Sequence, residues 1–166
     1  MVYTLLKMKI REMYLEKRYE ECNKKLTDLY REIIRDNQIT LAEQNQLIWY
    51  YYFYKSNIFK NENNLKYSLS FCLKSFRYIT FKDKFNTEYK GTLFLLANIY
   101  KELNEKQKAI KTYEYLLRLT KDKQYEMIFE NINNLRQNSN VITFTNKQNK
   151  KYDSNKESNF KFCCYF

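Results

Sequence analysis

The chain has 166 residues, of which 44% are hydrophobic and 18% aromatic, so it carries enough apolar side chain for one domain with a sizeable core. It has no proline and a single glycine, Gly91, which disfavours β-rich folds with many tight turns and favours long helices with short polar connections. The absence of histidine excludes His-based triads and His metal sites, and the net charge of +11 suits acidic partners or a solvated lysine-rich surface.

The first half of the chain predicts three helices. Apolar residues recur at helical spacing in 3–17 and in 19–35, where they include Cys22 as a small core residue. Thr40 and Glu43 then form a capping-box signature for a third helix that ends near residue 61. This helix contains the run LIWYYYFY, and because it is apolar nearly all round, we expect it to be the most buried helix.

The second half predicts four more helices and a tail. The fourth helix follows the polar turn ENN and continues to about Lys82, with Cys72 in the core. The others are expected at about 86–104, 106–121 and 123–137. Residues 138–166 are polar and basic without apolar period, so we predict a helical domain over 1–137 and a disordered tail after it.

Two of the predicted helix pairs are copies of each other. Residues 56–63, SNIFKNEN, align with residues 97–104, ANIYKELN, at an offset of 41 residues. The following helices align as well, so that Ser68, Cys72 and Ser75 fall on Ala109, Tyr113 and Leu116. A fainter copy is visible in the first 35 residues.

This pattern resembles the tetratricopeptide repeat. The residues that carry the likeness are Leu93, Leu96, Ala97, Tyr100, Ala109, Tyr113 and Leu116. The departures are Leu116 in place of Ala, Asn104 in place of Gly, and a spacing longer than the family's 34 residues. The resemblance implies an all-α array of antiparallel helix pairs in a short right-handed superhelix, with the seventh helix as a polar cap.

In that family the first helices of successive pairs line a concave groove that binds an extended peptide or a partner's tail. The resemblance places Asn57 and Asn98 at one equivalent groove position, where an amide can pair with both sides of a peptide unit. The other groove residues that it implies are Lys60, Lys101, Phe53, Phe94, Tyr50 and Arg11, with Lys7, Tyr14, Asn61 and Glu102 beside them. We therefore expect a cytoplasmic, non-catalytic adaptor or regulator without cofactor or metal. The sequence also allows self-association of the chain.

A narrower resemblance concerns the stretch AEQNQLIWYYYFY. It is similar to the amino-terminal part of bacterial peptide-sensing regulators of the Rap type, whose phosphatase members place a catalytic Gln before such a run. Here that place falls on Asn45, between Gln44 and Gln46. The alternative function is thus a regulator directed at a response regulator or associated with DNA.

Other sequence features add few chemical options. One glycine cannot form a Gly-rich phosphate loop, and the cysteine spacing does not match a zinc site. The segment starting at Cys163, CCYF, fits the C-a-a-X pattern, so a prenylated, membrane-associated protein is a further alternative. No signal peptide and no membrane-spanning run is predicted.

Overall fold

A computed structural model describes residues 2–80, 82, 86–120 and 124–143, and within these ranges the chain is helical without strands. The elements are α1 (Val2–Leu15), α2 (Tyr19–Arg35), α3 (Leu41–Asn61), α4 (Leu65–Ser75), the 3₁₀ helix η1 (Phe76–Tyr78), α5 (Thr87–Glu102), α6 (Lys106–Leu119) and α7 (Gln124–Thr143). The predicted all-α class is confirmed.

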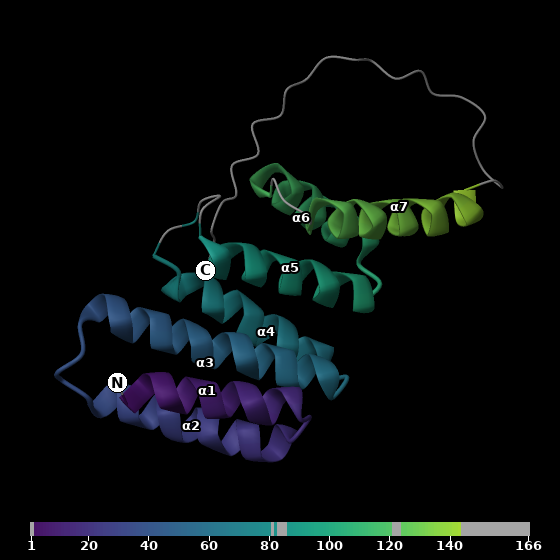
Figure 1. The fold of residues 1–166 in the computed structure, drawn as a ribbon. Helices are drawn as coiled ribbons and strands as arrows, with labels where there is room; N and C mark the ends of the chain where they lie inside the picture. Colours follow the sequence, from purple (N-terminus) through teal and green to yellow (C-terminus); the bar gives the residue numbers. More distant parts are fainter. Residues whose placement is uncertain (1, 81, 83–85, 121–123, 144–166) are drawn as a thin grey trace.

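The helices stack in chain order. Each helix packs mainly against the helix before it and the helix after it, which gives the antiparallel pairs α1/α2, α3/α4 and α5/α6, followed by α7 (Figure 1). Contacts are thus local along the sequence, as in repeat arrays. The predicted stacking of helix pairs is confirmed.

The turns inside the three pairs share one geometry. Each turn has one residue with a left-handed backbone: Lys17, Asn63 and Asn104, with φ of 59°, 60° and 61°. The next amide bonds back to a carbonyl five residues earlier, at 2.9, 2.8 and 2.9 Å, from Arg18 to Met13, from Asn64 to Phe59 and from Glu105 to Tyr100. This is the Schellman ending of a helix, so the first pair repeats the plan of the other two.

Small residues lie where the two helices of a pair cross. Ser56 and Ser68 are fully buried, and each hydroxyl donates a 2.8 Å hydrogen bond to the carbonyl of the other residue. The equivalent pair in the next repeat is Ala97 and Ala109, also fully buried. The small side chains allow the backbones to approach, as the aligned copies predict.

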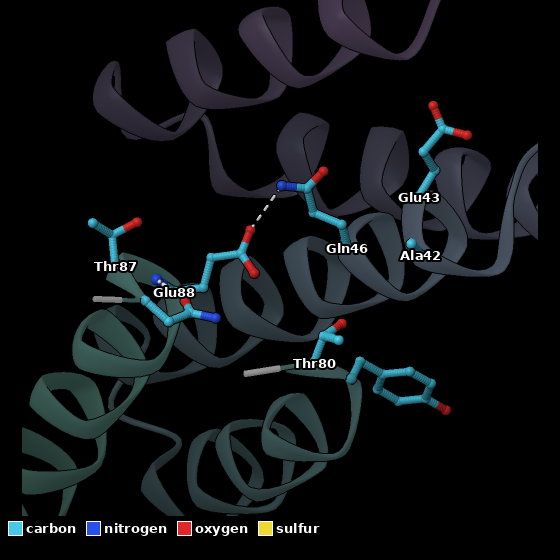
Figure 2. Close-up of a pocket in the computed structure, with 8 residues that line it drawn as sticks. Ala42, Glu43, Gln46, Thr80, Thr87 and Glu88 are labelled. Atoms are coloured by element: carbon cyan, nitrogen blue, oxygen red, sulfur yellow. Dashed lines mark hydrogen bonds between the residues drawn. The ribbon is translucent and has the colours of Figure 1, made fainter. Parts of the chain in front are cut away.

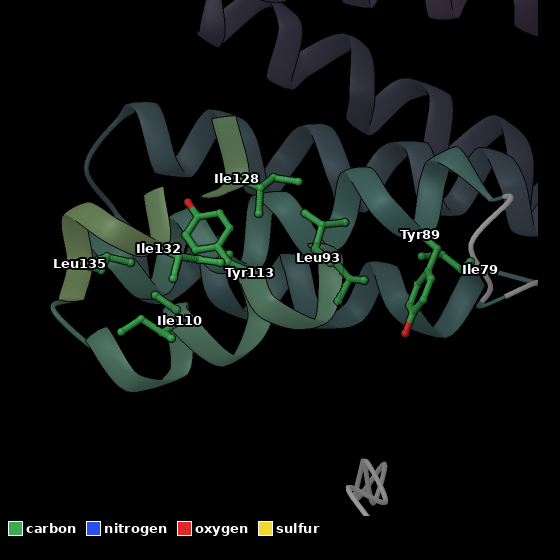
Figure 3. Packing of buried hydrophobic residues seen from close by; sticks show 11 residues of the cluster. Ile79, Tyr89, Leu93, Ile110, Tyr113, Ile128, Ile132 and Leu135 are labelled. Atoms are coloured by element: carbon green, nitrogen blue, oxygen red, sulfur yellow. The ribbon is translucent and has the colours of Figure 1, made fainter. Parts of the chain in front are cut away.

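The core consists of three neighbouring clusters along the array. One lies among α1, α2 and α3, a second between α4 and α5, and a third among α5, α6 and α7. In the third, the ring of Tyr113 is fully buried beside Ile128 and Ile132 of α7 (Figure 3). Cys22 and Cys72 are fully buried free thiols, which confirms their predicted place in the core.

Two expectations about the middle of the chain are wrong. The most buried helix is α5, with seven buried residues, whereas the longer α3 has five. The tyrosines of α3 are only partly buried, because a tyrosine packs its ring and keeps its hydroxyl near polar groups or water. The fourth helix ends at Ser75 and not at Lys82, since the chain turns through η1 and buries Ile79 in the third cluster.

The end of the chain also differs from expectation. α7 continues to Thr143, beyond the predicted end at Gln137, so the predicted tail begins inside this helix. The rest of the predicted tail and the motif that starts at Cys163 lie outside the described residues.

Candidate functional site

The odd-numbered helices α1, α3, α5 and α7 are joined side by side through polar side chains. The Tyr50 hydroxyl on α3 donates a 2.7 Å hydrogen bond to the Lys7 carbonyl on α1. Lys60 on α3 forms a 2.9 Å ion pair with Glu102 on α5. Lys101 on α5 donates a 3.0 Å hydrogen bond to the side chain of Asn131 on α7. These contacts define one continuous surface, which we call the odd-helix face.

Asn57 and Asn98 occupy equivalent places on this face. Each Nδ2 donates to the carbonyl one helical turn earlier, at 2.9 Å from Asn57 to Phe53 and at 3.0 Å from Asn98 to Phe94. Both side chains are half-buried. The two amides are therefore held in the same orientation by their own helices.

The two amide oxygens differ. Oδ1 of Asn98 accepts a 2.7 Å hydrogen bond from the Tyr113 hydroxyl. At Asn57 the position equivalent to Tyr113 is Cys72, and among the described residues no donor reaches Oδ1 of Asn57. Each amide thus retains one N–H for a ligand, and Oδ1 of Asn57 keeps both lone pairs whereas Oδ1 of Asn98 has already used one.

Lys60 and Lys101 are both engaged by neighbouring side chains. The Lys60 side chain is 22% exposed in its ion pair with Glu102, and Lys101 is exposed beside Asn131. Glu102 is exposed and Lys60 keeps part of its surface in solvent, so an acidic ligand group can replace Glu102 in this partly exposed ion pair. The alignment of the copies did not reveal this pairing, because it depends on how α3 and α5 approach.

The predicted aromatic residues pack against neighbouring rings of the array, Phe53 within α3 and Phe94 against α6. Phe53 stacks on Trp49 with ring centres 5.1 Å apart, and Phe94 meets Tyr113 edge-on at 6.1 Å. The Trp49 indole N–H donates a 3.0 Å hydrogen bond to Thr92 on α5. Phe53 and Phe94 are half-buried, so they offer a ring edge to a ligand while their inner surface packs against the fold.

At the α1 end of the face, tyrosine hydroxyls and one amide converge. Nδ2 of Asn61 lies 3.0 Å from the hydroxyls of both Tyr14 and Tyr19. Burial raises the pKa of Tyr50, and the nearby Arg11 guanidinium opposes that rise. The structure therefore places Asn61 beside Tyr14 and Arg11 near Tyr50.

A hollow that sequence reasoning missed lies at one edge of the same face. It measures about 440 Å³ and is lined by Ala42, Glu43, Gln46, Tyr78, Thr80, Asn86, Thr87 and Glu88 (Figure 2). Two capped helix starts meet here, at Thr40 for α3, as its capping signature predicts, and at Asn86 for α5. The recurrence of a side-chain N-cap at the start of α3 and again at the start of α5 is the sequence signal that could have located this edge of the odd-helix face.

The hollow carries acceptor groups for a cationic or amide-bearing ligand. Gln46 donates a 2.9 Å hydrogen bond to Glu88, and Glu43 is fixed by its capping box (Figure 2). The hydrogen bonds from Thr40 to Glu43 hold the pKa of this carboxyl below its usual value. Of the residues at the Rap-like position, Gln44 and Asn45 are half-buried.

Comparisons of the chain with family models, curated proteins and solved structures found no significant match. Within the described residues, no group of three or more Cys, Asp and Glu side chains is placed to hold a metal ion. Among the helices that the structure describes, none is long and apolar enough to cross a membrane.

Proposed function

We propose that this protein is a non-catalytic, tetratricopeptide-like array that binds an extended peptide or a partner's tail along the odd-helix face. The observation that carries the proposal is the repeated placement of Phe, Asn and Lys on α3 and α5, with the amide oxygen of Asn57 available. Packing alone does not require an amide at this place twice.

The chemistry of the face favours a peptide backbone with an acidic side chain. The N–H and Oδ1 of Asn57 can pair with the carbonyl and N–H of one peptide unit. One helical turn further along α3, Lys60 can exchange Glu102 for a carboxylate of the ligand. The half-buried rings of Phe53 and Trp49 supply flat apolar contact beside these polar groups.

The buried free thiols Cys22 and Cys72 suit a reducing compartment such as the cytoplasm. A peptide-binding array needs no nucleophile or general base, and the face offers neither in an activated form.

The test is selection of random peptides displayed on phage against the full-length protein, followed by affinity measurement with the selected peptides. Asn57→Ala should weaken binding about tenfold, as expected for the loss of hydrogen bonds worth ~1–2 kcal/mol. Asn98→Ala should have a smaller effect, because its amide oxygen already accepts a hydrogen bond from Tyr113.

Gln107→Ala is the matched control, since Gln107 is an exposed amide on the even-numbered helix α6. The proposal fails if no peptide is selected, or if the Asn57 and Gln107 variants bind equally. Binding to a DNA duplex that falls steeply with salt, and is unchanged by Asn57→Ala, would favour the nucleic-acid alternative instead.

A further inference from the structure

The first helix is apolar on two opposite sides. Its inner side packs Leu6, Ile10 and Met13 against α2 and α3, and Ile10 is fully buried. On its outer side, Leu5, Met8 and Leu15 are 58%, 64% and 67% exposed. A helix with two apolar sides normally has both sides covered.

The outer residues form one stripe. Leu5, Met8, Glu12 and Leu15 follow the alternating three- and four-residue spacing of a helix seam. A hollow of about 390 Å³ lies on this side and is lined by Met8, Arg11, Glu12, Leu15 and Glu16. α1 stands at one end of the array beside α2 and α3, and none of the described helices covers its outer side (Figure 1).

The charges along the stripe indicate what covers it. Lys9 and Glu16 flank the stripe on one side, seven residues apart, so they carry opposite charges at the same position of two successive heptads of the seam. If two copies of α1 lie antiparallel and are related by a two-fold axis at the height of Ile10, Leu5 of each copy faces Leu15 of the other. Lys9 of each copy then approaches Glu16 of the other, and Met8 covers the stem of Glu12.

The parallel arrangement is unfavourable. It would set Glu12 of one copy directly against Glu12 of the other in the centre of the seam, and like charges in close contact repel. We therefore propose that the outer stripe of α1 binds a second copy of this chain in antiparallel orientation, as a two-fold symmetric dimer. This contact does not involve Asn57, and Arg11 lies between the outer stripe and Tyr50 of the odd-helix face.

The dimer is weak. One short helix from each copy buries an area at the low end of specific interfaces, so the expected dissociation constant is micromolar or weaker. Glu16 also pairs with Arg18 of its own chain at 2.8 Å, and it shares its carboxylate between Arg18 and Lys9 of the second copy. Both charges are exposed in the single chain, which keeps them available.

The test is sedimentation equilibrium of the full-length protein over a wide concentration range. The wild type should show a reversible monomer–dimer equilibrium. Lys9→Glu and Glu16→Lys should each raise the dissociation constant about tenfold, because each change places like charges at two symmetric contacts. The double variant K9E/E16K should restore the wild-type constant, since it exchanges the charges and keeps the pairing.

Met8→Glu should abolish the dimer, and circular dichroism should show unchanged helicity, because Met8 is exposed in the single chain. A wild type that remains monomeric at every concentration would overturn the proposal and leave the stripe to a different protein or to residues 144–166. A dimer that persists in Met8→Glu, or single charge variants that the double variant does not rescue, would also overturn it.

Discussion

The Tyr113 hydroxyl on α6 donates a 2.7 Å hydrogen bond to Oδ1 of Asn98 on α5, and the equivalent Asn57 has Cys72 in the place of Tyr113. The same amide oxygen therefore accepts a side-chain hydrogen bond in one repeat and, among the described residues, none in the other. A repeat array can keep one architecture and vary its binding site in this way, by changing a residue on the neighbouring helix.

Tyr113→Phe should lower the free energy of unfolding by about 1–2 kcal/mol. The ring still fills its buried place, but Oδ1 of Asn98 loses its donor in a half-buried position. Urea unfolding followed by circular dichroism measures the change, and Tyr67→Phe, at a 57% exposed site, is the control with no expected effect. Equal stability of the two variants would show that water replaces the phenol at Asn98.

The stability of the protein should fall as the pH rises above 10. Burial, followed by the charge of Glu102, raises the pKa of Tyr113 to about 12. A phenol with a raised pKa in the folded state stabilises the fold fully below pH 10, and this contribution is lost between pH 10 and 12. Denaturant titrations at several pH values should show this decline, and it should be smaller in Tyr113→Phe.

A glycine in place of Lys17 should stabilise the turn between α1 and α2. Lys17 has the left-handed backbone that Asn63 and Asn104 adopt in the other two turns, and a lysine is strained there. Lys17→Gly should therefore raise the melting temperature, with a gain of about 1 kcal/mol. Lys24→Gly, at an exposed position inside α2, is the matched control and should cost about 1 kcal/mol. A loss in both variants would contradict the strain at Lys17.

Much of this fold could be predicted from the sequence because its determinants are local. The capping pair Thr40 and Glu43 marks the start of α3 correctly. The end of α4 could not be predicted, since it is set by the burial of Ile79 against helices that come later in the chain. The equivalence of Asn57 and Asn98 was predictable, because it follows from the alignment of the two copies. The bond from Tyr113 to Asn98 and the pairing of Lys60 with Glu102 were not predictable, because they depend on how separate helices approach.

Gly91→Ala should stabilise the protein by roughly 0.5–1 kcal/mol. Gly91 lies inside α5, where glycine is unfavourable, and a Cβ built there meets no atom within 4 Å. Thermal unfolding measures the gain, and Ala97→Gly, at a fully buried site of the same helix, should be destabilising. Gly91 is equivalent to Tyr50 on α3, so it lies on the odd-helix face. If a bound peptide approaches the α5 backbone at Gly91, Gly91→Ala should lower the peptide affinity while it raises the stability.

Lys55 is a buried cation, and its replacement tests whether its hydrogen bonds outweigh the cost of burying its charge. It is 8% exposed on α3, and its ammonium group donates to the side chains of Asn23 and Thr27, the latter at 3.2 Å. Burial lowers its pKa below the usual 10.5. The folded protein then binds fewer protons than the unfolded chain just below pH 10.5, so the contribution of Lys55 to stability rises with pH in that range.

Lys55→Met keeps a long apolar stem and removes the buried charge. The variant should be more stable than the wild type at neutral pH by about 1 kcal/mol, as when a buried charge is replaced by an apolar residue of similar volume. It should also lack the rise in stability toward pH 10. Asn23 is half-buried and can turn to water, and Thr27 keeps its 2.9 Å bond to the Asn23 carbonyl, so neither is left without a partner. If Lys55→Met is destabilised equally at every pH, the hydrogen bonds of the ammonium group outweigh the cost of burying its charge.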